Sequence, residues 1–362
     1  MSWNMPDFLK DKAPMLTDKK KEVTVMSRLI KNKYFLFIFS AVVIGLLCGN
    51  VQAQKSIKIR YFTGMTPAHY FSSDLLPFFA GEVEKRTNGS VKVEVYPGGQ
   101  LFGYRDGIDA TTMGAVEMGL TSLGHWGGHN PIFSFSDYFL LIDDMDHWFR
   151  ARDEIHPILD ALFQQKNVKV LYYSAYGGNG ICGRVQIESL NDIKGLKVRA
   201  PVPGALACLA AWGATPIKIA AAEVYDAIGK GAIDACASSW GSMYARKFYE
   251  VAKHAVGPIW WTVWVNFISL DTWKSLSPEN QKIIMEVSRD TEKRSLGLMK
   301  AFDKKSLEKL EQVGTVKILT SEEKKAWGKP LRPAYSAWVK KCADKGYGKQ
   351  AEEILNVLDR VR

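Results

Sequence analysis

Hydrophobic and polar residues along the chain follow two periods, the alternation typical of strands and the three-to-four-residue spacing typical of helices. Apolar residues recur on one helical face between residues 71 and 86, until Asn88 and Gly89 end the pattern. The first predicted elements are strand 57–62, helix 71–86, strand 91–96, helix 107–114 and strand 117–120. This succession predicts an α/β fold built on a largely parallel sheet.

A second set of elements follows in the other half of the chain. Strands are predicted over residues 168–173 and 184–187, and a long helical pattern begins near Pro278 and runs to Gly314. A helix of about 30 residues would be roughly 45 Å long, nearly the span of two small domains. Thr320 followed by Glu323 predicts a capping box that opens a C-terminal helix. Because no linker and no fixed repeat separates the halves, we expect two lobes that exchange strands.

The first 53 residues have the pattern of a secretory signal. Three basic residues between positions 28 and 33 precede an apolar run over residues 34–47, and Ala53 provides a small residue for cleavage. At 14 residues the run is short for a membrane-spanning helix. We expect translation to start at Met26 and cleavage to follow Ala53. A lipid anchor on Cys48 is the alternative, disfavoured because a leucine precedes that cysteine.

Charge and cysteine content narrow the function classes. The chain has a net charge of +10, and removing the leader, with its eight basic and four acidic residues, leaves +6. The lysines are scattered rather than gathered in a basic block, so nucleic acid is not an expected partner. Four cysteines remain in the exported chain, Cys182, Cys208, Cys236 and Cys342. Export permits disulfides, and four cysteines allow three full pairings between which the sequence does not decide.

Two short motifs suggest chemistry that their context does not support. Residues 178–183 match the glycine spacing of a dinucleotide-binding loop, but a strand-like segment follows where a helix would be needed, so we expect a glycine-rich crossover loop. His125 and His129 are separated by two glycines, which disfavours a helix that would place both rings on one face. No nucleophile motif and no carboxylate pair accompanies them. We expect no enzyme, no cofactor and no metal.

Arg199 is the candidate binding residue that the sequence marks most clearly. It ends a short extended segment, immediately before the break at residues 201–204. A guanidinium at the end of a strand can direct its planar pair of donors into a cleft, where it binds a carboxylate or sulfonate. An exposed arginine at a strand end is the alternative.

The motifs around Arg199 occur in a characteristic order. They cover residues 93–101, 114–119, 189–199, 213–216, 223–228, 231–234 and 247–251. In this order they resemble the periplasmic solute-binding proteins of TRAP transporters. The resemblance implies a two-lobed α/β Venus-flytrap fold, with strands that cross between the lobes and a long helix that spans both. Residues 54–176 and 265–304 would then form lobe I, and residues 177–264 and 305–362 would form lobe II.

The same resemblance implies a set of ligand-binding residues. Arg199 matches the arginine that holds the substrate carboxylate, and Asn179 stands where several members have a second arginine. Ser122 and His125 stand where sialic-acid-binding members have glutamate and arginine. The remaining candidates are Ser238, which is often asparagine, Thr262, and the tryptophans Trp126, Trp240 and Trp261. Serines precede Trp240 where metal-binding members have an acid, so a metal-assisted mode is disfavoured.

The differences from the family at these positions indicate what kind of ligand to expect. With one arginine and several tryptophans, we expected a monocarboxylate or small sulfonate with an apolar or aromatic body, because a second carboxylate without a cation is costly to bury. The resemblance implies capture by lobe closure in the periplasm of a Gram-negative bacterium and delivery to the small and large TRAP permease subunits by a monomer. An ABC-type binding protein and, less favoured, an exported enzyme acting on organic acids are the alternatives.

Overall fold

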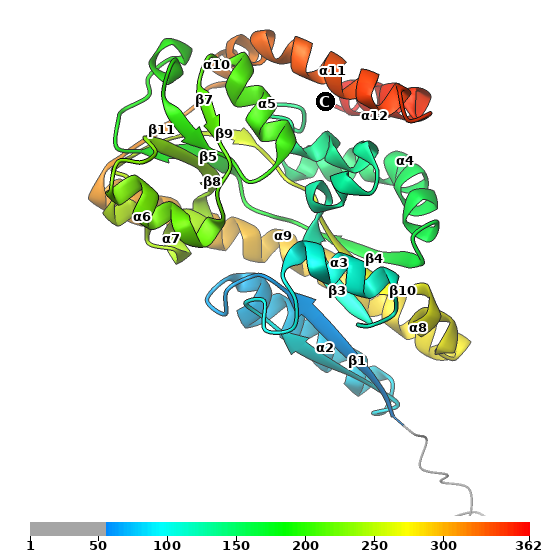
Figure 1. Cartoon of the computed structure of the whole chain (residues 1–362). Coiled ribbons are helices and arrows are strands. Elements are labelled where there is room, and N and C mark those ends of the chain that lie inside the picture. Colours follow the sequence, from blue (N-terminus) through cyan, green and yellow to red (C-terminus); the bar gives the residue numbers. More distant parts are fainter. Residues whose placement is uncertain (1–55) are drawn as a thin grey trace, which may run out of the picture. The chain divides into compact units, whose positions relative to one another are not determined.

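The computed structural model describes residues 56–362 (Figure 1). The expected start at Met26, the cleavage after Ala53 and the question of a lipid on Cys48 lie outside the described residues. Within residues 56–362, no helix is both long enough and apolar enough to cross a membrane.

Lobe I is built on a five-stranded mixed sheet. Its strand order is β2 (Val91–Tyr96), β1 (Ile57–Thr63), β3 (Met118–Ser122), β10 (Trp264–Ser269) and β4 (Val168–Ser174). β1 is parallel to both neighbours, whereas β10 is antiparallel to β3 and β4. The helical elements are the π-helical turn at Phe71–Leu75, α2 (Leu76–Arg86), α3 (Tyr104–Thr112), the 3-10 segments Leu123–Gly128 and Pro131–Asp137, α4 (Met145–Gln164) and α8 (Leu270–Ser275). The predicted strands and helix 71–86 are confirmed.

Lobe II is built on a second mixed sheet of six strands. Their order is β11 (Thr315–Ile318), β9 (His254–Trp260), β5 (Asn179–Gly183), β8 (Ala235–Ser239), β6 (Lys197–Arg199) and β7 (Thr215–Ile217). β5 is antiparallel to β8 and β9, and β6 is parallel to β7 and β8. The helices of this lobe are α5 (Pro203–Ala211), α6 (Val224–Gly229), α7 (Trp240–Ala245) and α10 (Ser321–Gly328).

Three connections join the two sheets. The chain passes from β4 to β5, returns from β9 to β10, and crosses a third time along α9 (Pro278–Val313). With 36 residues, α9 is about 54 Å long. It contacts β4 and α2 in lobe I and α7 and β11 in lobe II, and Figure 1 shows it passing along both sheets. The expectation of crossing strands and one shared long helix is therefore confirmed.

Local sequence signals explain where the long and the C-terminal helices begin. The Ser277 side chain accepts a hydrogen bond from the backbone N–H of Asn280, and Pro278 occupies the first helical position of α9. At α10 the Thr320 hydroxyl and the Glu323 carboxylate each accept from the other residue's backbone N–H, which confirms the predicted capping box.

The C-terminal segment divides between the lobes. The sequence analysis assigned residues 305–362 to lobe II, and β11 pairs there with β9. The helices α11 (Arg332–Ala343) and α12 (Gly348–Arg360) instead bring Trp338, Cys342 and Ile354 into the lobe I core, and α12 packs on α4. The chain thus ends by covering lobe I, because the apolar face of α12 has its complement there rather than on the second sheet.

The strand predicted at residues 184–187 is wrong. The strand is β5, at Asn179–Gly183, so the glycine-rich segment is itself a central strand rather than a crossover loop, and residues 184–186 after it are exposed. A Cβ at Gly180 would overlap the Trp240 ring and the Val256 carbonyl oxygen. These glycines therefore allow close packing around Trp240, and no phosphate-binding turn follows them.

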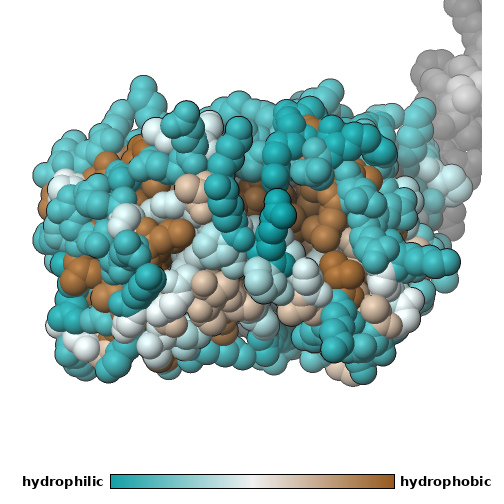
Figure 2. Space-filling model, turned by 90° about the horizontal axis from the view of Figure 1, so that it is seen from above, coloured by the Kyte–Doolittle hydropathy of each residue, from teal (hydrophilic) through white to brown (hydrophobic). Residues whose placement is uncertain are grey.

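Polar and apolar residues also separate at the surface. On the face shown in Figure 2, hydrophilic residues predominate and hydrophobic residues occupy scattered areas between them. One apolar core fills lobe I, and two smaller cores lie in lobe II, one of them around Trp212 and Trp260 and the other around Trp240.

Candidate functional site

A cavity of about 620 Å³ receives residues from both sheets and from the crossing strands. Tyr104 and Ser122 come from lobe I, and Arg199 and Ser238 come from lobe II. The ends of β9 and β10 contribute Trp260, Thr262 and Trp264. A ligand in this cavity would therefore contact both lobes and the connection between them.

Arg199 lies at the end of β6, held between β7 and β8 in register with Ile217 and Cys236. Its side chain is buried, with the residue only 5% exposed, and its Nε–H donates to the Ile219 carbonyl oxygen at 3.1 Å. Burial lowers the pKa of the Arg199 guanidinium, and the nearby charge of Arg246 lowers it further. A guanidinium nevertheless stays protonated in proteins. Arg199 is thus a buried cation, and within residues 56–362 no carboxylate forms an ion pair with it.

Three further cations line the same cavity, Arg105, Lys218 and Arg246. The described part of the chain offers none of them an ion pair, although arginines elsewhere pair readily, as Arg60 does with Glu117. Asp106 is the acidic residue that shares the lining. The sequence interpretation missed these three cations, because residues 105, 218 and 246 meet only in the tertiary structure. The expectation of a single cationic anchor is therefore wrong for the cavity as a whole.

Hydroxyl and amide groups surround the cations. The Ser122 hydroxyl lies 2.8 Å from His125 Nδ1, and the His125 ring stacks on Tyr104 with centroids 4.6 Å apart. Burial lowers the pKa of His125 to about 4, helped by the charge of Arg105, so this histidine is neutral at pH 7. It can accept or donate a hydrogen bond there but adds no positive charge.

A second set of hydrogen-bonded polar side chains lies where the chain passes from β4 into β5. The Tyr176 hydroxyl lies 2.8 Å from Ser239 Oγ, which donates to it, and 2.9 Å from Ser242 Oγ. The Asn179 amide donates to the carbonyl oxygens of Gly177 and Trp260, both at 3.2 Å. These bonds orient Asn179 and Tyr176 at the start of β5 before any ligand binds.

The structure brings six of the nine predicted site residues together in this cavity: Ser122, His125, Asn179, Arg199, Ser238 and Thr262. The three predicted tryptophans lie elsewhere. Trp126 is fully buried in lobe I, where its Nε1–H donates to Thr121 Oγ1 at 3.0 Å, and Trp240 is buried in a lobe II core. Trp261 lines a different cavity.

The alternation of side chains along a strand explains which tryptophans reach the cavity around Arg199. Along an extended segment, residues 260, 262 and 264 point to one side and residue 261 to the other. Trp260 and Trp264 therefore flank Thr262 in the cavity, while Trp261 faces away. The alternation of side chains along this segment could have predicted Trp260 and Trp264, rather than Trp261, as cavity residues.

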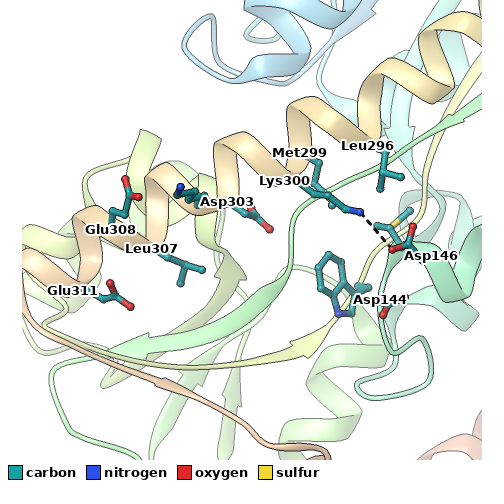
Figure 3. A pocket seen from close by; sticks show the side chains of 12 residues that line it. Asp144, Asp146, Leu296, Met299, Lys300, Asp303, Leu307, Glu308 and Glu311 are labelled. Atoms are coloured by element: carbon teal, nitrogen blue, oxygen red, sulfur yellow. Dashed lines mark ion pairs between the residues drawn. The ribbon is translucent and has the colours of Figure 1, made fainter.

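The other cavity, of about 540 Å³, follows α9 (Figure 3). Lys300 forms an ion pair with Asp146 at 3.5 Å, and Asp303 directs its carboxylate from the helix toward the cavity. The Asp303 carboxylate accepts the Gly178 backbone N–H at 2.8 Å, and burial raises the pKa of Asp303 to about 7. Five acids and two lysines line this cavity, so it does not suit an anion.

The two histidines of the His125–His129 motif have separate partners. His125 contacts Ser122, whereas His129 Nε2 lies 3.3 Å from Asp109 Oδ1. The segment Leu123–Gly128 is a short 3-10 helix. Among the residues described, no group of three or more His, Cys, Asp or Glu side chains is arranged to hold a metal ion.

Comparison with known proteins places this geometry in a family. The family model for the bacterial extracellular solute-binding protein, family 7, matches residues 64–341. The chain is 26% identical over 320 residues to the 2,3-diketo-L-gulonate-binding periplasmic protein YiaO of Escherichia coli (strain K12), covering 86% of this chain and 93% of that protein. It is 28% identical over 267 residues to the C4-dicarboxylate-binding periplasmic protein DctP of Rhodobacter capsulatus, covering 70% and 78%.

Solved structures share the fold. The sugar acid binding protein DctPAm from Advenella mimigardefordensis, in complex with galactonate, superposes with a TM-score of 0.77 at 21% identity, over 85% of this chain and 99% of that one. A TRAP periplasmic solute binding protein from Sulfitobacter sp. NAS-14.1, with bound β-D-galacturonate, gives a TM-score of 0.75 at 20% identity, over 83% and 99%.

Proposed function

Because the chain belongs to the family 7 bacterial extracellular solute-binding proteins, the TRAP-transporter type, we propose that it captures a hydroxylated organic acid, of the sugar-acid class, in the cavity around Arg199. The observation that carries this proposal is the buried guanidinium of Arg199, which shares one cavity with three more cations, none of the four forming an ion pair within residues 56–362. A buried charge is costly without a partner, and an anionic ligand would supply that partner.

The polar lining favours hydroxyl groups on the ligand. Serine, threonine and asparagine side chains from both lobes surround the cations, and a buried polar group binds a matching hydroxyl far better than an apolar surface. The aromatic faces of Tyr104, Trp260 and Trp264 would pack on the C–H side of a sugar ring. This proposal replaces the expected apolar or aromatic body. Relatives that bind diketogulonate, galactonate and galacturonate support the change.

Lobe closure would complete the site. The ligand would contact both lobes and the crossing strands, so it binds the closed form more tightly than the open form and shifts the population toward closure. The closed protein would then deliver the acid to a membrane permease. No covalent step is needed for this function.

A titration panel tests the ligand class. Calorimetry on the purified protein would compare glucuronate, galacturonate and galactonate with benzoate and succinate. We expect at least one sugar acid to bind tenfold or more tightly than benzoate and succinate. Tightest binding of benzoate would restore the apolar-body expectation, and conversion of any acid to a product would instead indicate an enzyme.

A C4-dicarboxylate is the second candidate, and Arg246 favours it. This arginine shares the cavity with Arg199 and forms no ion pair within the described residues, so it could hold a second carboxylate where Asn179 replaces the arginine expected from the family. In that case succinate or malate would bind most tightly, and Arg246→Ala would weaken dicarboxylates far more than monocarboxylates.

A further inference from the structure

Two of the four described cysteines face each other across neighbouring strands. Cys182 in β5 and Cys236 in β8 are directly opposite in the antiparallel register, and their sulfur atoms lie 3.4 Å apart. The other two are separate, since the Cys208 sulfur accepts the Phe139 backbone N–H at 3.3 Å and Cys342 lies in the lobe I core. The structure thereby selects one of the pairings that the sequence left open.

The strand geometry suits a covalent bond between these two residues. Directly opposite residues in an antiparallel pair have Cα atoms about 4.5–5.5 Å apart, inside the range of roughly 4.4–6.8 Å that disulfides use. Both side chains are on the same side of the sheet, in the core that contains Val224, Met243 and Leu310. A rotation of the side chains would bring the sulfur atoms to bonding distance without a shift of the strands.

We propose that Cys182 and Cys236 form a disulfide when the protein folds outside the cytoplasm. Two thiols would lose two protons and two electrons as the S–S bond forms, and a disulfide-bearing oxidant would take them up: a thiol–disulfide exchange protein would become its dithiol form, or oxidised glutathione would become two glutathione thiols. Extracytoplasmic compartments supply such oxidants. Since both cysteines are fully buried in the folded protein, with exposures of 1% and 0%, the exchange takes place while the strands are still pairing.

The disulfide would tie together the strands that carry the lobe II side of the ligand cavity. β5 begins with Asn179, β8 carries Ser238, and Cys236 is also in register with Arg199 on β6. The bond would close a loop between residues 54 positions apart, which restricts the unfolded chain and so stabilises the folded one. The inference depends on export and not on the identity of the ligand.

Thiol trapping tests the proposal on the full chain, expressed with its own leader. Periplasmic extract would be acid-quenched, denatured and alkylated with N-ethylmaleimide without reductant, and peptides would be mapped by mass spectrometry. We expect alkylation of Cys208 and Cys342, and a linked peptide containing Cys182 and Cys236. Alkylation of all four residues would overturn the proposal, and so would a link to Cys208 or Cys342.

Stability provides a second readout. Reductant should lower the apparent melting temperature of the exported protein by roughly 5 °C. The Cys208→Ala/Cys342→Ala variant should keep this response, and the Cys182→Ala/Cys236→Ala variant should lose it. An unchanged melting temperature of the exported wild-type protein on reduction would contradict a stabilising bond, whatever acid the protein binds.

Discussion

At the residue scale, the proposed binding function depends on the charge of Arg199, which no carboxylate of residues 56–362 neutralises by an ion pair. Arg199 is fixed by the pairing of β6 on both sides and by its bond to the Ile219 carbonyl oxygen. These contacts orient the guanidinium but do not neutralise it. A buried charge held in this way lowers the stability of the empty protein. It would strengthen the binding of an anionic ligand, because the ligand would supply the counter-charge.

Replacing Arg199 should therefore separate binding from stability. Arg199→Ala should weaken ligand binding roughly 30-fold to several-thousand-fold, corresponding to about 2–5 kcal/mol, while the melting temperature of the empty protein stays unchanged or rises. Arg199→Lys should recover little, because lysine lacks the planar pair of donors. Calorimetry and thermal unfolding measure the two effects.

Arg184 is the matched control, because it is an arginine of the same lobe that pairs with Asp234 at 3.1 Å on the outer surface. Arg184→Ala should leave the affinity within twofold of wild type. If Arg199→Ala also binds with near-wild-type affinity, the cavity around it is not the ligand site.

At the element scale, close packing around β5 limits the size of the side chains that its positions can hold. β5 follows the first crossing, and its glycines accommodate the Trp240 ring and the neighbouring strand. α9 runs beside the same crossing, and its Asp303 accepts the Gly178 N–H. Contacts with Trp240 and with α9 therefore hold the segment that leads into β5 and the strand itself.

Gly180→Ala should destabilise the protein. The added methyl group would overlap the Trp240 ring and the Val256 carbonyl oxygen, and overpacking of this kind typically costs about 1–3 kcal/mol. Gly297→Ala is the control, because this α9 position has open space around it and alanine favours a helix by about 1 kcal/mol. Urea unfolding should lower the free energy of unfolding in the first variant and raise it in the second. Equal effects would show that Gly180 is not tightly packed.

Asp303 should make stability depend on pH. Burial raises the pKa of Asp303 from 3.8 to about 7, so the folded protein holds this proton while the unfolded chain releases it near pH 4. The stabilisation is complete below about pH 4 and is lost as the pH rises through 7, on the order of 2–4 kcal/mol in total.

Asp303→Asn should flatten this dependence, since the amide oxygen can still accept the Gly178 N–H without gaining charge. Thermal unfolding between pH 4.5 and 8 measures the difference from wild type. Asp290→Asn is the control on the same helix, where an exposed carboxylate pairs with Arg86 at 2.8 Å. A wild-type pH profile in Asp303→Asn would show that this carboxyl group does not titrate in the expected range.

At the scale of the whole molecule, three connections link the two sheets, and the return from β11 to α11 and α12 is a fourth link between lobes that have separate apolar cores. Separate cores would allow the lobes to move as units about these connections. Trp264 lies on the strand that follows the second crossing and lines the cavity, so the proposed closure would change its surroundings.

Ligand binding should be visible in tryptophan emission and in stability. A sugar acid at a hundred times its dissociation constant should raise the free energy of unfolding by about 2.7 kcal/mol, and it should change the emission spectrum. Trp264→Phe should reduce the spectral change, whereas Trp126→Phe, which removes a buried lobe I indole, should retain it. Equal loss in both variants would contradict closure around the cavity of Trp264.

The sequence by itself was sufficient for many local elements. The strands β1 to β4, the long helix α9 and the cap at Thr320 follow from short-range periodicity and from side chains that bond to nearby backbone groups. Arg199 was identified by its position at a strand end and by the motifs around it. The strand at residues 179–183 was missed because glycines carry no hydrophobic pattern, and only contact with Trp240 explains them.

Tertiary structure alone decided the properties that depend on which distant segments of the chain meet in space. Arg105, Lys218 and Arg246 come from distant segments, and only the fold shows that they share a cavity and form no ion pair within residues 56–362. Packing likewise assigned α12 to lobe I and put Cys182 beside Cys236. Periodicity records which face of an element is apolar, but not which other element covers it. The positive charge of the cavity, and with it the proposal of a hydroxylated acid, therefore follows only from the folded chain.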